Sequence, residues 1–155
     1  QFVFIALILS LFGDIFLMFK GVMFIAGLTH FLTAHLFYIL AFAQIEIPSN
    51  IPILIALILI ALIFLFSIWK ALGKLLLPVL AYIFVITSML YFAFGFYSTA
   101  DNPQGNIVLA AAVLFVISDC LLAVNMFQTP FKWAHPLIYL TYFPAQTLFA
   151  WSLAL

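Results

Sequence analysis

Long apolar runs separated by short polar segments make up almost the whole chain. Each run is close to the length of about 20 residues at which an α-helix crosses a bilayer. The apolar residues are continuous and do not alternate with polar ones, which selects helices over strands. Short links between the runs imply that successive helices are antiparallel. The expected helices cover residues 2–19, 22–43, 53–69, 75–97, 107–127 and 134–153.

The composition indicates that this pattern belongs to a membrane protein. The chain has 155 residues, of which 70% are hydrophobic and only 5% are charged, whereas soluble domains are about 25% charged. The sequence therefore predicts one all-α domain over residues 1–155, a polytopic transmembrane helix bundle. The net charge is zero and there is no arginine, so no nucleic-acid partner is expected. A single cysteine, Cys120, offers no disulfide framework.

The lysines predict how the bundle is oriented. They are Lys20, Lys70, Lys74 and Lys132. All four fall in alternate links, while Glu46 and Asp101 occupy the other links. The positive-inside rule then places the lysine-bearing links in the cytoplasm, in a plasma membrane or, for a bacterial chain, an inner membrane. The first and last residues lie inside apolar runs, so a further N-terminal helix is expected to be missing from this chain.

Two aspartates interrupt the apolar runs. An Asp at the centre of a membrane helix costs about 2.5–3.5 kcal/mol on insertion scales, and such acids are functional by default. With a rise of 1.5 Å per residue, Asp14 and Asp119 lie about 9 and 13 Å from the same end of their helices. We expect them to face one cavity, with helices 2–19 and 107–127 as neighbours. A purely structural hydrogen bond between helices is the alternative.

Other polar side chains recur at helical spacing. Ser10 shares a face with Asp14, one turn away. The remaining sets are His35 with Tyr38, Ser118 with Asn125, and the stripe His135, Tyr139, Tyr142 and Gln146. A polar stripe on a membrane helix faces the bundle interior or a cavity. The candidates to orient a substrate are Ser10, His35, Tyr38, Ser118, Asn125, Tyr142 and Gln146.

A few positions have competing interpretations. Gly13 and Gly27 are expected to let the first two helices approach closely. Tyr82 is expected to be a packing or interfacial residue, as is Tyr91. His30 lies at the depth of the acids, whereas His35 lies higher, at about 20 Å. Which histidine belongs to the site is therefore left open.

A pair of buried carboxyls suits proton-transfer chemistry. Two close carboxyls in an apolar site share one proton, which they can donate and later recover from water. Such a pair of carboxyls suits acid-catalysed cleavage of an acetal or enol ether through an oxocarbenium-like state. There is no GxSxG motif for acyl chemistry. His30 and His35 do not share a helix face as a zinc-binding i, i+4 pair would, so neither a metal nor a cofactor is expected. A proton-coupled transporter could use the same pair.

Four stretches carry a resemblance to a known family. They are LSLFGDIFLMF (9–19), FIAGLTHFLTAHLFYILAF (24–42), AAVLFVISDCLLAVNMF (111–127) and YLTYFPAQTLFAWSL (139–153). Together they resemble the YhhN-like lysoplasmalogenase family of integral membrane proteins. The family normally carries another N-terminal helix.

The resemblance implies an activity and a set of site residues. It implies hydrolysis of the vinyl ether bond of a lysophospholipid substrate held in the membrane, with no cofactor. The products would be a fatty aldehyde and a glycerophospho-headgroup. The family elements fall on Asp14, His35, Tyr38, Ser118, Asp119, Asn125, Tyr142 and Gln146. Asp14 and Asp119 would be the acid and the base, in either order. A transporter or lipid-binding protein and a metal hydrolase of the alkaline ceramidase type remain alternatives, and oligomeric state is open.

Overall fold

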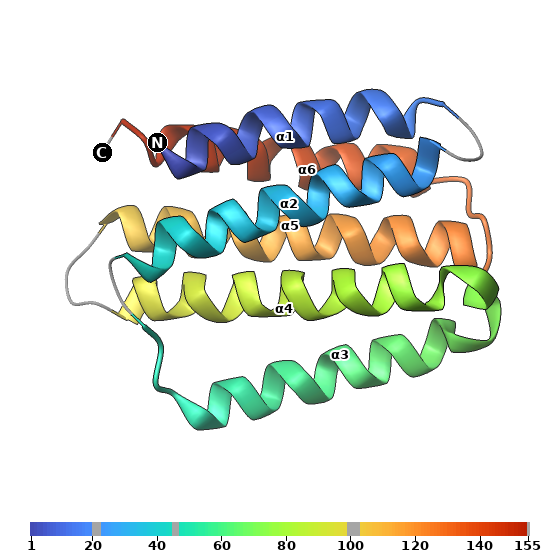
Figure 1. The fold of residues 1–155 in the computed structure, drawn as a ribbon, viewed down its shortest axis with the longest axis horizontal. Coiled ribbons are helices and arrows are strands. Elements are labelled where there is room, and N and C mark those ends of the chain that lie inside the picture. The colour runs from blue at the N-terminus through green and yellow to red at the C-terminus, as the bar shows by residue number, and fades with distance from the viewer. Residues whose placement is uncertain (20–22, 45–46, 99–102, 155) are drawn as a thin grey trace.

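The computed structural model describes residues 1–19, 23–44, 47–98 and 103–154, and these are helical almost throughout. The elements are α1 (Phe2–Leu17), α2 (Met23–Ala43), α3 (Ile51–Leu72), the 3₁₀ turn η1 (Gly73–Leu75), α4 (Leu76–Ser98), α5 (Pro103–Phe127) and α6 (Ala134–Trp151). The predicted all-α class is confirmed. The 3₁₀ turn η1 follows α3 directly and leads into α4, so that residues Ile51–Ser98 are helical throughout although the chain reverses between the two helices (Figure 1).

The ends of α3 explain where the predicted boundaries were wrong. The helix expected to begin at residue 53 begins at Ile51, because Pro52 fits in its first turn, where the missing N–H costs nothing. The Asn50 side chain caps this turn by accepting a hydrogen bond from the Ile53 N–H at 3.1 Å. At the other end Gly73 has φ +49°, in the left-handed region that favours glycine. This residue lets the chain reverse from α3 into α4.

Five helices close a ring and one lies outside it. Around the ring α1 packs on α2, α2 on α4, α4 on α5, α5 on α6, and α6 returns to α1. Figure 1 shows α3 at the edge of the bundle, against α4. The described residues of α1 and α5 do not pack on each other. The expectation that these two helices are neighbours was therefore wrong, because α6 lies between them.

Glycines allow α1 and α2 to pack closely, as predicted. A Cβ added at Gly13 would lie 2.7 Å from the Phe31 ring, and one at Gly27 would lie 2.9 Å from Leu17. Both distances are too short for a real side chain. The ring of helices is filled by aromatic side chains, with Phe115 fully buried near its centre.

The outer surface of the bundle is apolar. Three helical stretches, Met23–Ala43, Ile51–Ser98 and Pro103–Phe127, are long and apolar enough to cross a membrane. Side chains such as Ile63 and Phe66 are 71% and 84% exposed, an arrangement that lipid tolerates and water does not. The chain is an integral membrane protein.

Three lysines lie at one end of the bundle, which we call the lysine end. Lys70 and Lys74 border the α3–α4 turn, and Lys132 lies in the α5–α6 link. In Figure 1 both connections are on the right. Lys20, Glu46 and Asp101 lie outside the described residues, so the cytoplasmic orientation of the lysine links stays a prediction.

Candidate active site

A cavity of about 860 Å³ lies among the helices and extends from the lysine end past the middle of the bundle. All six helices contribute to its wall, which is mainly aliphatic and aromatic. The polar side chains on this wall are Asp14, Tyr82, Thr87, Ser118, Asp119, Cys120, His135, Tyr139 and Tyr142. The structure thus places the two intramembrane carboxyls on one cavity, although their helices are not neighbours.

Asp14 accepts a hydrogen bond at the end of a chain of donors. The Tyr142 hydroxyl of α6 donates to Asp14 Oδ2 at 2.7 Å. Gln146 Nε2, one turn further along α6, donates to the Tyr142 oxygen at 2.9 Å. The Tyr38 hydroxyl of α2 donates to Gln146 Oε1 at 3.2 Å. Three helices therefore orient one carboxyl, and hydrogen bonds in such a chain polarise and strengthen one another.

Asp119 has a different tyrosine partner. The Tyr82 hydroxyl of α4 donates a short hydrogen bond to Asp119 Oδ2 of α5. The interpretation of Tyr82 as a packing or interfacial residue was wrong. One signal was present in the sequence: Tyr82 lies about 9 Å into α4 and Asp119 about 12 Å into α5 from the lysine end, which is nearly the same layer.

Of the two histidines in α2, His35 is the one that packs against the tyrosine of this second pair. Its Nδ1 lies 2.6 Å from the Phe31 carbonyl oxygen. A carbonyl can only accept, so Nδ1 carries the proton and Nε2 presents a lone pair. The His35 ring packs edge-on against Tyr82, with centroids 5.4 Å apart. His35 is fully buried behind the cavity wall, and its Nε2 has no hydrogen-bond partner among the described residues.

His30 lies elsewhere. Its Nδ1 bonds the Ala26 carbonyl at 2.8 Å, and its ring packs on Phe16 of α1 with centroids 4.8 Å apart. It is not part of the cavity wall. The depth estimate that favoured His30 could not give the direction in which its side chain points.

Of the remaining predicted residues, one lies on the cavity wall and two lie away from it. Ser118 is buried on the cavity wall. Ser10 is buried beside the Tyr38 hydroxyl. Asn125 is outside the wall, and its Oδ1 accepts from the Phe131 N–H at 3.2 Å. The structure therefore gives Asn125 a role in holding the α5–α6 link, where the sequence predicted contact with substrate.

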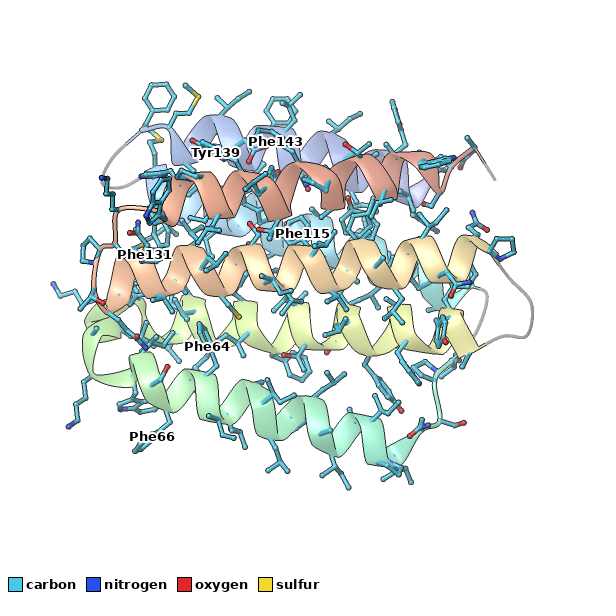
Figure 2. All side chains as sticks on the ribbon, turned by 180° about the vertical axis from the view of Figure 1, so that it is seen from behind. Phe64, Phe66, Phe115, Phe131, Tyr139 and Phe143 are labelled. Carbon is cyan, nitrogen blue, oxygen red and sulfur yellow. The ribbon has the colours of Figure 1, made fainter. Side chains whose placement is uncertain are left out.

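The predicted polar stripe on α6 only partly faces inward. Tyr142 is buried, but Tyr139 is 54% exposed. Figure 2 shows Tyr139 and Phe143 on the α1 side of α6. His135 and Tyr139 line the cavity near the lysine end, although neither was among the predicted site residues.

The partners of the two carboxyls are tyrosine hydroxyls. Within residues 1–19, 23–44, 47–98 and 103–154, no three His, Cys, Asp or Glu side chains gather in a group that could hold a metal ion. The arrangement offers two proton-exchanging carboxyls, each held by a phenol, in an apolar cavity. Such a cavity suits a lipid that needs acid–base chemistry at one polar bond.

Fold and site thus define a membrane-embedded helix bundle with two tyrosine-bonded carboxyls on one apolar cavity. The chain belongs to the YhhN family, which matches residues 1–153. This confirms the family resemblance noted in the sequence.

Two relatives carry the same name. "Lysoplasmalogenase TMEM86B" of Homo sapiens is 33% identical over 148 residues, which cover 95% of this chain and 61% of the relative. The Sus scrofa protein of that name is 30% identical over 150 residues, covering 96% of this chain and 62% of the relative. The chain therefore spans about three fifths of the length of these relatives. No solved structure shows a significant match.

Proposed function

We propose that this chain is a membrane hydrolase that cleaves the vinyl ether bond of lysoplasmalogen-type lysophospholipids. The observation that carries the proposal is the pair of tyrosine-bonded carboxyls on one apolar cavity inside a membrane bundle. The names of the two relatives support the same substrate.

The proposed reaction consumes one water and needs two proton carriers. One carboxyl protonates the β-carbon of the vinyl ether, and the π electrons form the new C–H bond. The positive charge is then shared between the α-carbon and the ether oxygen as an oxocarbenium ion. Water adds to the α-carbon and loses a proton to the other carboxylate. As the C–O bond of the hemiacetal breaks, the carboxyl that took the water proton gives it to the glycerol oxygen. The carboxylate that protonated the β-carbon takes the proton of the hemiacetal hydroxyl, which leaves a fatty aldehyde, a glycerophospho-headgroup and both carboxyls in their starting states.

Each side chain has a part in this scheme. Asp14 and Asp119 carry the protons, and whichever is ionised also stabilises the oxocarbenium charge. Tyr142 and Tyr82 are positioning residues that hold the carboxyls by hydrogen bonds. The apolar wall excludes bulk water, so that water attacks only the activated carbon.

Purified protein in lipid nanodiscs tests the proposal directly. Incubation with a lysoplasmalogen should release aldehyde, and Asp14→Asn and Asp119→Asn should each abolish the release. Ser88→Ala is the matched control, because the Ser88 hydroxyl only bonds the Phe84 carbonyl of its own helix. Full activity in both Asn variants would refute the assigned site. Proton uptake without aldehyde would support a transporter, and loss of activity with a chelator would support a metal hydrolase.

We propose further that the lysine end faces the cytoplasm, which opens the cavity toward the cytoplasmic leaflet. Lys70, Lys74 and Lys132 all lie there. A Lys74→Cys variant in intact cells should react with a membrane-impermeant maleimide only after the cells are opened. Labelling of intact cells would reverse the orientation.

A further inference from the structure

The cavity reaches well beyond the two carboxyls. Its far part lies mainly between α3, with Leu57 and Ala61, and α4, with Thr87 and Leu90. At 1.5 Å per residue, Leu57 and Leu90 lie about 21 to 22 Å from the lysine end, against about 12 Å for Asp119. The α3–α4 part of the cavity therefore extends about 10 Å past the carboxyls, parallel to the helix axes.

The packing of α3 is consistent with an open gap at this level. The buried residues of α3 are Leu65, Ile68 and Leu72, all in its second half, where they form a cluster with Val79 of α4. Figure 1 shows α3 diverging from α4 toward its N-terminus. The bundle is thus closed between these helices near the lysine end and looser further away.

The two faces of α3 differ in what they contact. Figure 2 shows Phe64 on the side of α3 that faces α4 and Phe66 pointing away from the bundle. Phe64 lines the cavity, whereas Phe66 is 84% exposed. The side chains on the inner face of this part of α3 are apolar, so α3 offers no side-chain hydrogen bond to a headgroup there.

The part of the cavity on the α1–α6 side differs from the α3–α4 part in its side chains and in its length. Between α1 and α6 the wall includes His135 and Tyr139 together with Leu11 and Ile15, and it does not extend as far from the lysine end. The three described lysines lie at this end of the bundle, and none of the described residues at the other end is a lysine. A phosphate group is therefore favoured at the lysine end and a hydrocarbon chain at the far end.

We propose that the gap between α3 and α4 holds the single hydrocarbon chain of the lysophospholipid, and that the chain reaches the bilayer sideways through it. The phosphate then stays at the lysine end, and the bond next to the glycerol lies beside the carboxyls between these two positions. This placement rests on the proposed function for the bond that is cleaved. It lets the substrate slide in from the membrane without pulling its chain out of the hydrocarbon layer.

Photolabelling locates the hydrocarbon chain of a bound lipid without requiring turnover. The probe is an alkyl-ether lysophosphatidylethanolamine, which lacks the vinyl double bond, with a diazirine near the chain end. The probe is irradiated together with the whole protein in nanodiscs, with and without excess unlabelled lipid. The labelled peptides are then mapped by mass spectrometry. Competable labels should fall on residues 51–64 and 83–90. Competable labels confined to α1 and α6, or none above the uncompeted background, would overturn the proposal.

A matched pair of variants on α3 provides the second test. Ala61→Phe fills the gap from the inner face, whereas Ile63→Phe changes a side chain that is 71% exposed on the outside. Overpacking of this kind should lower competable labelling by about tenfold in Ala61→Phe and leave it unchanged in Ile63→Phe. Equal labelling in the two variants would refute the proposal. Labelling as expected without aldehyde release would refute only the proposed function, and aldehyde release with labels elsewhere would refute only the position of the chain.

Discussion

The two carboxyl–tyrosine pairs differ in what stands behind each tyrosine. Behind Asp14, Tyr142 receives a hydrogen bond from Gln146, which in turn accepts one from Tyr38. Behind Asp119, Tyr82 packs against the edge of the His35 ring and makes no second hydrogen bond to the described residues. The first pair is oriented by a network that joins α1, α6 and α2, and the second by one bond between α4 and α5. Similar chemical groups can thus be positioned either by a network or by a single contact.

The largest expected effect comes from the carboxyls themselves. Asp14→Asn and Asp119→Asn should each lower kcat for aldehyde release by about 10²- to 10⁴-fold, the usual contribution of a general acid or base. Steady-state kinetics and a thermal unfolding curve measure activity and folding separately. If one variant keeps most of its activity, the two pairs are unequal in chemistry as well as in support.

The second largest effect on activity should come from the two tyrosine hydroxyls that hold the carboxyls. Tyr142→Phe and Tyr82→Phe each remove a hydrogen bond to a carboxyl, worth about 1.5–3 kcal/mol if the carboxyl is charged, or roughly 10- to 150-fold in rate. Tyr142→Phe should also lower the melting temperature more, because it leaves the Gln146 amide without its tyrosine acceptor. Equal melting temperatures for the two variants would remove the proposed difference in support.

A smaller effect should mark the residues behind Tyr142. Gln146→Leu and Tyr38→Phe should each lower kcat by about 2- to 10-fold, the range of a neutral hydrogen bond, with KM unchanged. In a double-mutant cycle, Gln146→Leu should couple to Tyr142→Phe and be additive with Tyr82→Phe. Coupling to Tyr82→Phe would show that the two pairs share one network.

The smallest effect on chemistry should come from Asn125. Asn125→Ala should leave kcat and KM nearly unchanged and lower the free energy of unfolding by about 1 kcal/mol, since it removes the hydrogen bond to the Phe131 N–H. Thermal unfolding and aldehyde release together test this. A large loss of activity at full stability would restore the substrate-orienting role that the sequence suggested.

The sequence predicted the fold class and much of the site, but not how the parts meet. Apolar runs of membrane-spanning length indicated the helices, and the two aspartates stood out because acids are costly in lipid. Tyr82 was missed because a tyrosine in a membrane helix usually packs or anchors, and its spacing does not reveal a partner on another helix. The position of α3 outside the ring was missed because its residues are apolar on all sides, which hides the face that meets the bundle.

What the sequence determined by itself were local properties: the approximate span of each helix, the polar residues that interrupt the apolar runs, and the small residues Gly13 and Gly27 at the α1–α2 contact. These depend on the 1.5 Å rise and on the chemistry of single positions. The tertiary structure decided which tyrosine meets which carboxyl, that α6 separates α1 from α5, and where the cavity runs. Those outcomes depend on the order and rotation of the helices, which are set by side-chain packing across the whole bundle.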